Sequence, residues 1–382
     1  MSLPLVYLDN NATTRPAPEV LAAMQPCLSE LYANPASPHR FGSRAAAAVE
    51  EARSRVAALL GARESEIVFT SGGTESNNAA LRGVFAAQPH RRHLVVSTVE
   101  HHALLAPAEL LERRGVSVTR IGVDRQGRLD LDALADALRD DTLLVSIMLA
   151  NNETGVIFPL AEVCRIAHAR GALVHTDAVS AIGKIPVNVA ELGVDLLSAS
   201  AHKLHGPKGV GALYIRRGTP FCPLLVGGPH ENQRRAGTLN VPGIVGFGAA
   251  CALASDSAGV NEQVRRLRDH FERELARRVG DVQIVAADAP RLPNTSCVCF
   301  AGLSAEAILL LLSEAGVCVS SGSACSSGSL EPSHVLRAMG LDPHVAQGQI
   351  RFSFGRYNTA DEVERVLALL PEIVAKVAES KI

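Results

Sequence analysis

The sequence predicts an α/β protein: a mostly parallel sheet wrapped by helices, joined to a smaller α+β domain. Short apolar runs and helical segments alternate from residue 67 to residue 176. The apolar runs do not alternate with polar residues, which is typical of strands covered on both faces. After Ile215 this alternation stops and a polar loop follows. We therefore expect a large domain over 16–255 and a small domain made of 1–15 and 256–382.

Local patterns place the individual elements. Before the polar loop, the expected helices are 18–31, 43–60, 74–87, 102–114, 130–138 and 160–170. The expected strands of that part are 67–70, 94–97, 116–121, 143–149, 172–176, 194–197 and 212–215. After the loop, helices are expected at 261–279, 305–314, 332–339 and from 360 onwards, and strands at 282–285, 294–300, 317–319 and 350–354.

Composition excludes several classes of protein. The chain has 382 residues, 47% of them apolar, and a net charge of −2 without basic blocks, which disfavours binding to nucleic acid or to anionic membranes. No apolar run approaches the length of a membrane span, and Met1–Leu5 does not begin a signal peptide. The eight cysteines form no C-x-x-C pair, and Cys297 and Cys299 are expected to be buried on a strand. We expect a soluble, reduced, cytoplasmic protein.

The stretch around Lys203 carries the first chemical signal. The apolar run 194–197 ends in small residues, which are followed by His202, Lys203 and a turn rich in glycine. A lysine at a strand end can be a Schiff-base nucleophile if its amine is kept partly neutral. The ordinary alternative is a surface lysine in a glycine-rich hairpin, because lysine is usually exposed.

Two further segments complete a set that fits pyridoxal phosphate. An apolar strand ends on Asp177, and the cofactor needs both a lysine for its aldehyde and an acid for its pyridinium nitrogen. A third segment consists of a strand, a glycine turn and a helix that begins near Gly73 and Thr74. Helix N-termini present free N–H groups and a positive dipole to phosphate.

The strand ends are expected to meet in one crevice. Ligands of parallel sheets lie beyond the carboxyl ends of the strands, where His101, Asn152 and Asp177 are all predicted to lie. The polar segment 7–15 is interpreted as a loop over this site; its alternative is an ordinary turn and helix cap before Pro16.

Cys325 is the most specific feature of the second half. It lies in the stretch 320–329, in which eight of ten residues are serine or glycine, a composition that predicts flexibility. A cysteine on a mobile arm can act as a nucleophile that travels, provided that nearby cations or N–H groups lower the pKa of its thiol. Taken alone, a single cysteine in such a loop would carry no function.

These segments together resemble the cysteine desulfurases of the NifS/IscS type, class V aminotransferases with the pyridoxal-phosphate fold of type I. The resemblance runs from 7–14 to 350–353 and is nearer to NifS at 202–205 and 333–335. It implies pyridoxal phosphate as cofactor, L-cysteine as substrate and a homodimer. It also implies that an iron–sulfur scaffold protein accepts the sulfur, for nitrogen fixation or for housekeeping cluster assembly.

The resemblance assigns a role to each matching position. Lys203 binds the cofactor aldehyde and shuttles protons, and Asp177 pairs with the pyridinium nitrogen. His101 stacks on the ring and acts as acid or base, whereas His102 faces solvent. Cys325 takes the sulfur and transiently ligates a shared iron–sulfur cluster. The other implied cofactor contacts are Gly73, Thr74, Asn152, Ser180, Ser200, His202 and, across a dimer interface, Thr238.

The resemblance also implies a substrate contact, and the sequence departs from the usual family pattern at three places. Arg351 is implied to clamp the substrate carboxylate, beside Asn152, with its bidentate guanidinium. Ser180 stands where the family usually has glutamine, and its shorter side chain reaches less far towards the cofactor's phenolic oxygen. Ala201 replaces a common glycine. Residues 232–233 are Asn-Gln where Arg-Gly is usual, in the loop that bears the implied dimer contact.

The implied reaction moves the sulfur of L-cysteine to Cys325 as a persulfide and leaves L-alanine. One alternative keeps the cofactor and changes the reaction to that of a selenocysteine lyase or a related aminotransferase. The other is a non-catalytic protein with the same fold that serves as a binding partner. The long cysteine loop disfavours the first alternative, and the presence of both Lys203 and Cys325 disfavours the second.

Overall fold

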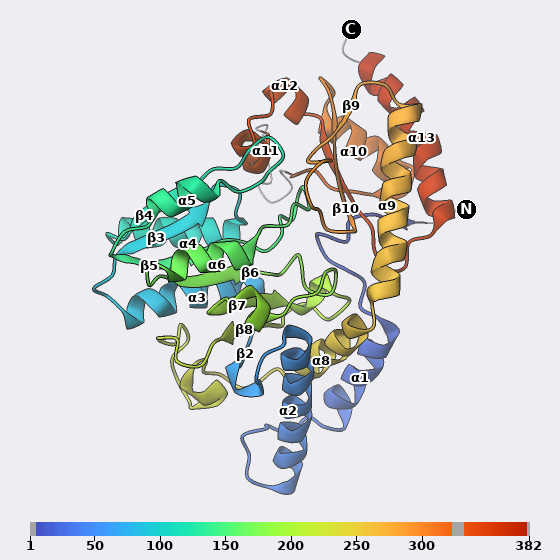
Figure 1. Cartoon of the computed structure of the whole chain (residues 1–382). Coiled ribbons are helices and arrows are strands. Elements are labelled where there is room, and N and C mark those ends of the chain that lie inside the picture. The colour runs from blue at the N-terminus through green and yellow to red at the C-terminus, as the bar shows by residue number, and fades with distance from the viewer. Residues whose placement is uncertain (1–4, 323–331, 380–382) are drawn as a thin grey trace.

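A seven-stranded sheet forms the centre of the larger part of the chain (Figure 1). The structure is a computed structural model that describes residues 5–322 and 332–379. In spatial order the strands are β2 (Ile67–Thr70), β8 (Gly211–Ile215), β7 (Leu196–Ser200), β6 (Leu173–Asp177), β5 (Thr142–Ser146), β3 (His93–Ser97) and β4 (Ser117–Ile121). Only β8 runs antiparallel to its neighbours, which confirms the predicted mostly parallel sheet.

Helices cover both faces of this sheet. They are α1 (Pro18–Ser29), α2 (Arg40–Leu60), α3 (Gly73–Ala87), α4 (His102–Arg113), α5 (Leu131–Ala137), α6 (Leu160–His168), α7 (Val189–Leu192) and α8 (Val241–Ser255). One apolar cluster joins α3 and α4 to one face of the sheet. A larger cluster joins α2, α5, α6 and α8 to the other face. The strands are therefore buried on both sides, as their unalternating apolar sequences predict.

A second, smaller core lies at the upper right of Figure 1. It contains the antiparallel strands β9 (Val282–Ile284), β10 (Thr295–Phe300) and β12 (Gln349–Ser353), and the parallel pair β1 (Val6–Tyr7) and β11 (Val317–Cys318). The helices α9 (Ala258–Arg278), α10 (Ala305–Glu314) and α13 (Ala360–Glu379) pack in this core, whereas the buried residues of α11 (His334–Ala338) and α12 (Pro343–Ala346) join the large cluster. Phe271, Phe352 and Phe354 pack together at its centre. The domain boundaries given above remain a prediction.

Helix α8 was missed by the sequence analysis, which expected the first helix of this region only at residue 261. The helix is apolar all around, so it has no polar face and no amphipathic period. Its small residues let it pack closely on α2: a Cβ at Gly248 would lie 2.6 Å from the Cα of Ala52. The short elements α7, α12 and β1 were also missed, because two to four residues carry little periodic signal.

Within the described residues, no single helix is long and apolar enough to cross a membrane. Only α8 and α9 counted together reach the required length and composition, and they are bent by 75° to each other.

A buried ion pair fixes the polar loop after β8 to the large core. The Nη1 and Nη2 atoms of Arg53 donate to the two carboxylate oxygens of Glu231 at 2.9 and 2.8 Å. The backbone N–H of Phe69 donates to the same carboxylate at 2.8 Å, and the guanidinium lies 4.7 Å from the centroid of the Phe69 ring. Helix α2, strand β2 and the loop are thus joined at one point.

We expect Glu231→Ala to destabilise the protein strongly. The substitution leaves the buried guanidinium of Arg53 with the exposed carboxylate of Glu50 as its remaining ion-pair partner, and breaking a buried pair costs roughly 3–5 kcal/mol. Glu51→Ala, which removes an exposed carboxylate paired with Arg55 on the same helix, should cost less than about 1 kcal/mol. Urea unfolding of both variants and the wild type measures the two losses. Equal losses would contradict a structural role for the buried pair.

Candidate active site

Asp177 presents a buried carboxylate at the carboxyl end of β6. Its side chain is 8% exposed, and it accepts hydrogen bonds from Asn77 Nδ2 at 2.6 Å and from the backbone N–H of Val179 at 3.0 Å. Within the described part of the chain, no lysine or arginine forms an ion pair with it. A buried anion held by neutral donors favours a cation as its partner.

The first turn of α3 forms an uncapped helix N-terminus beside this carboxylate. The helix begins at Gly73, and no side chain caps its first N–H groups. A Cβ at Gly211 would lie 2.7 Å from the Cα of Gly72, so strand β8 can approach this turn only with glycine. Ser200, at the end of β7, lies on the same side of the turn. The structure thus brings Gly73, Thr74 and Ser200 together at a turn able to bind an anion.

Lys203 follows β7 in a short 3₁₀ turn, 201–203, and faces the N-terminal segment. Its Nζ donates to the backbone oxygens of Asn11 at 2.5 Å and Ala12 at 2.9 Å. The same segment is bound a second time, because the N–H and the hydroxyl of Thr14 both donate to the carbonyl of His202 at 2.9 Å. The N-terminal segment, predicted as a loop over the site, thus crosses Lys203.

The two histidines predicted at the site are both neutral near pH 7. Burial lowers the pKa of His101, and its Nδ1 accepts from the N–H of Ala103 at 3.0 Å, which places the ring proton on Nε2. Burial and, to a lesser extent, Lys203 lower the pKa of His202 to about 4. His102 is exposed, as expected, and its ring centroid lies 4.9 Å from that of His334.

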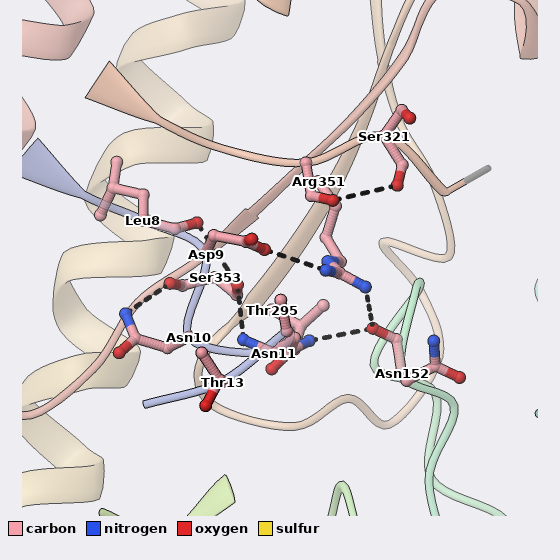
Figure 2. Close-up of polar contacts among 12 residues, drawn as sticks. Leu8, Asp9, Asn10, Asn11, Thr13, Asn152, Thr295, Ser321, Arg351 and Ser353 are labelled. Atoms are coloured by element: carbon pink, nitrogen blue, oxygen red, sulfur yellow. Dashed lines mark hydrogen bonds and ion pairs between the residues drawn. The ribbon is translucent and has the colours of Figure 1, made fainter. Parts of the chain in front are cut away.

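Arg351 lies on β12 with a guanidinium that already has partners (Figure 2). Its Nη2 donates to Asp9 Oδ1 at 3.0 Å and its Nη1 to the carbonyl of Asn152 at 3.1 Å, while its Nε is buried without a partner. A substrate carboxylate would therefore share or replace the contact with Asp9. The sequence analysis did not identify Asp9. Asn152 contributes its backbone oxygen here, which also accepts from Asn11 Nδ2 at 3.0 Å.

Ser180 and Thr238, two of the predicted cofactor contacts, lie in different surroundings. Ser180 is buried after β6, and its carbonyl accepts from Lys184 Nζ at 2.9 Å. Thr238 is exposed, three residues beyond Arg235, which forms an ion pair with Glu75 in the first turn of α3. The loop bearing Thr238 is thus attached beside the anion-binding turn. Its contact across a dimer remains a prediction.

Besides Asp9, four further residues of the site were missed by the sequence analysis. Asn11 and Asn77 bind Lys203 and Asp177, respectively. Asn77 lies one turn after Gly73, so helical spacing could have identified it. Glu153 follows Asn152 directly and accepts from the Ser333 hydroxyl at 2.6 Å. Glu100 precedes His101 and lies buried beneath the site.

Glu153 also meets the other end of the cysteine loop. A Cβ at Gly322 would lie 2.2 Å from Glu153 Oε2, so a larger residue there would have to displace the end of this side chain. Cys325, and with it the predicted sulfur and iron–sulfur contacts, lies outside the described residues. Within them, no cluster of three or more His, Cys, Asp or Glu side chains could hold a metal.

The donor set fits pyridoxal phosphate. A buried carboxylate suits a protonated pyridine nitrogen, an uncapped helix N-terminus suits a phosphate, and a lysine at a strand end suits an aldehyde. In addition, Asn77 Oδ1 is buried without a partner beside Asp177, which leaves hydrogen-bonding capacity for a bound group.

We expect Glu100 to make the protein less stable as the pH rises. Burial raises the pKa of its carboxyl to about 8, although Ser97 Oγ and the Met148 N–H donate to it. The folded protein therefore holds a proton that the unfolded chain has lost above about pH 4.5. Between that pH and about 8, the unfolding free energy should fall by about 1.4 kcal/mol per pH unit because of this group.

Urea unfolding at pH 5.5, 6.5 and 7.5 measures this slope in the wild type and in Glu100→Gln, which cannot ionise. The unfolding free energy of the wild type should fall relative to that of Glu100→Gln as the pH rises. Glu112→Gln, at an exposed ion pair, serves as the control and should not change the slope. Parallel curves for the wild type and Glu100→Gln would mean that Glu100 is already ionised at pH 5.5.

Comparisons with known proteins agree with this geometry. The chain matches the family described as Aminotransferase class-V over residues 6–366. A protein named cysteine desulfurase from Cereibacter sphaeroides is 53% identical over 371 residues, which cover 97% of this chain and 95% of that protein. Cysteine desulfurase 2 of Trichormus variabilis is 51% identical over 372 residues, covering 97% and 94% of the two chains.

Solved structures give the same result. A structure titled as a NifS-like protein superposes with a TM-score of 0.91 at 41% identity, covering 97% of this chain and all of that chain. A structure titled "SspA in complex with cysteine" gives 0.83 at 34% identity, covering 93% of this chain and 100% of that one. With this fold, this donor set and a match over nearly its whole length, the chain belongs to the aminotransferase class-V family.

Proposed function

We infer that this protein is a pyridoxal-phosphate-dependent cysteine desulfurase that converts L-cysteine to L-alanine. The observation that carries this function is the meeting of Lys203, Asp177 and the first turn of α3 at one edge of the sheet. Relatives at about half identity bear the name of this activity, and one related structure is titled as a complex with cysteine.

The residues that would hold the cofactor follow from these donors. Lys203 would bind its aldehyde and Asp177 its ring nitrogen, with Gly73, Thr74 and Ser200 at its phosphate. We keep His101, Asn152, Ser180, His202 and the partner's Thr238 as further proposed contacts. When bound, pyridoxal phosphate supplies an electron sink that stabilises negative charge at the substrate Cα.

This chain's own side chains then perform the binding and proton transfers. Arg351 binds the substrate carboxylate, and the contact with Asp9 is exchanged for it. Lys203, once released, removes the Cα proton. His101, with its proton on Nε2, is neutral near pH 7 and can donate without carrying a charge into the site.

Cys325 is the proposed sulfur acceptor. Its thiolate attacks the sulfur of the substrate, so that an S–S bond forms while the Cβ–S bond breaks. The two electrons of the broken bond stay on the carbon skeleton, which takes up a proton at Cβ. The sum is L-cysteine plus a thiol giving L-alanine plus a persulfide on Cys325, with no external oxidant or reductant.

The remaining proposals concern partners and organisation. The protein would act as a homodimer and pass sulfur to an iron–sulfur scaffold protein, with Cys325 as a transient ligand of a shared cluster. Residues 16–255 would form the cofactor-binding domain, and 1–15 with 256–382 the domain that carries the cysteine loop.

We expect Cys325→Ser to keep the cofactor and lose desulfuration. A serine hydroxyl is a poor nucleophile near neutral pH, so alanine and sulfide release from L-cysteine should fall by more than about a hundredfold. Cys222→Ser is the control, because that thiol is only half-buried and lies away from the site; its rates should match the wild type. Mass spectrometry after L-cysteine without reductant should find the added sulfur on Cys325. Added sulfur on Cys318, or wild-type turnover of Cys325→Ser, would favour a lyase.

We expect Asp177→Asn to bind pyridoxal phosphate but to lose at least tenfold in kcat, since a neutral amide cannot stabilise a protonated ring nitrogen. Cofactor absorbance and single-turnover kinetics separate binding from chemistry. Asp195→Asn alters another buried carboxylate, at the start of β7, and should lower stability without this loss in kcat. A kcat of Asp177→Asn within threefold of wild type would remove Asp177 from the mechanism.

A further inference from the structure

A second lysine shares a hollow with Lys203. Lys184 follows β6, and together with Lys203 it lines a cavity of about 50 Å³ whose lining contains no aspartate or glutamate. The other ionisable groups of the lining are His205 and Arg356. The pair is unusual for this chain, since only five of its 37 lysines and arginines are lysines. Elsewhere in the sequence the cationic residue is almost always arginine, whose side chain does not lose its proton.

Asn11 connects the two amines. Lys184 Nζ lies 3.4 Å from Asn11 Oδ1 and donates to the Ser180 carbonyl at 2.9 Å, while Lys203 Nζ donates to the backbone oxygen of Asn11. Asn294 Nδ2 holds the same Oδ1 at 2.9 Å. Among the described residues, the hydrogen-bond acceptors of Lys184 are therefore all neutral, and Asn11 contacts both Lys184 and Lys203.

The charges that act most strongly on Lys184 are positive. Burial, then Lys203, then Arg351 lower the pKa of Lys184 to about 7. Burial lowers the pKa of His205 to about 4, with smaller effects of Arg356 and Lys184, so this imidazole is neutral. Two ammonium groups in a hollow without a carboxylate repel each other, and such groups titrate as a pair rather than singly.

We propose that Lys184 is a positioning residue for Lys203: the two amines share one proton near neutral pH, and Lys184 carries the charge when Lys203 is neutral. The inference rests on the proposed function, in which a neutral Lys203 amine must attack the cofactor aldehyde and later accept the Cα proton. Protons reach Lys184 from solvent, because it also lines a surface groove of about 660 Å³ that shares Ala254, Ser257 and Asn261 with the small hollow.

Titration of the lysine side chains in the apoprotein tests this pairing directly. With ¹³C- and ¹⁵N-labelled lysine, NMR follows each amine, and five lysines give a spectrum that single substitutions can assign. Lys184→Met removes the neighbouring charge, whereas Lys184→Arg makes it permanent. The titration midpoint of Lys203 should be highest in Lys184→Met and lowest in Lys184→Arg, with a difference of about one pH unit or more.

Two further variants serve as checks on this result. Lys208→Met removes an exposed lysine five residues from Lys203 and should leave the Lys203 midpoint unchanged. Lys203→Met should raise the midpoint of Lys184 by at least about half a pH unit, which tests the pair even if Lys184→Arg does not fold. Equal Lys203 midpoints in the Met and Arg variants, or an unmoved Lys184 midpoint in Lys203→Met, would overturn the proposal.

Capture of pyridoxal phosphate by the apoprotein gives a second readout that needs no desulfurase activity. At pH 7 the rate should fall severalfold in Lys184→Met and stay at or above wild type in Lys184→Arg, because only a neutral amine attacks an aldehyde. A merely structural lysine would slow both variants alike. If the titrations behave as expected but L-cysteine is not desulfurated, the proposed function fails and the lysine pair stands.

Discussion

The N-terminal crossing at Asn11 is the contact on which the site depends. Its amide and backbone reach Ser353 and Thr295 in the small sheet and Asn152 and Lys203 beside the large one. A buried amide left without partners would cost about 1–3 kcal/mol, so these bonds favour this one position of the segment. The segment therefore ties the two cores to each other, as the contacts of Asn11 with Ser353, Thr295 and Asn152 in Figure 2 show, and it does so beside Lys203.

The distribution of charge explains how such a site can bind an anionic amino acid and an anionic cofactor. Arg351 is a cation, Lys184 and Lys203 are proposed to carry one positive charge between them, and the nearby histidines are held neutral by burial. Burial also raises the pKa of the carboxyls of Glu100 and Glu153, which weakens the anions beneath the site. Asp177 remains the buried carboxylate aimed at the crevice. Positive potential thus dominates, with one anion placed for a ring nitrogen.

Ion pairs and close contacts anchor the loop after β8 and the described ends of the cysteine loop. The Arg53–Glu231 pair and the Arg235–Glu75 pair fix the loop after β8 to α2 and to the first turn of α3. Glu153 meets both described ends of the cysteine loop, through Gly322 and Ser333. Precise geometry at a binding site requires such supporting contacts, because the reaction rate falls steeply when a catalytic group is displaced.

The sequence by itself determined the class of the fold and led to the proposed reactive groups. The signals were local: apolar runs that end in Asp177 or near Lys203, and a glycine turn before Gly73. Such local patterns directly reflect backbone geometry and burial. Resemblance to a family supplied the cofactor and the reaction. Helix α8 escaped this reasoning because a helix buried on all sides carries no period.

Only the tertiary structure decided which groups act on one another. The pairing of Arg351 with Asp9 joins residues 342 positions apart, and Asn11 reaches Lys203 across 192. The side chains packed around a lysine decide whether it is an exposed cation or titrates together with another amine. The local sequence around Lys184 does not distinguish these two possibilities. Long-range contacts set solvation and charge, and these set the chemistry.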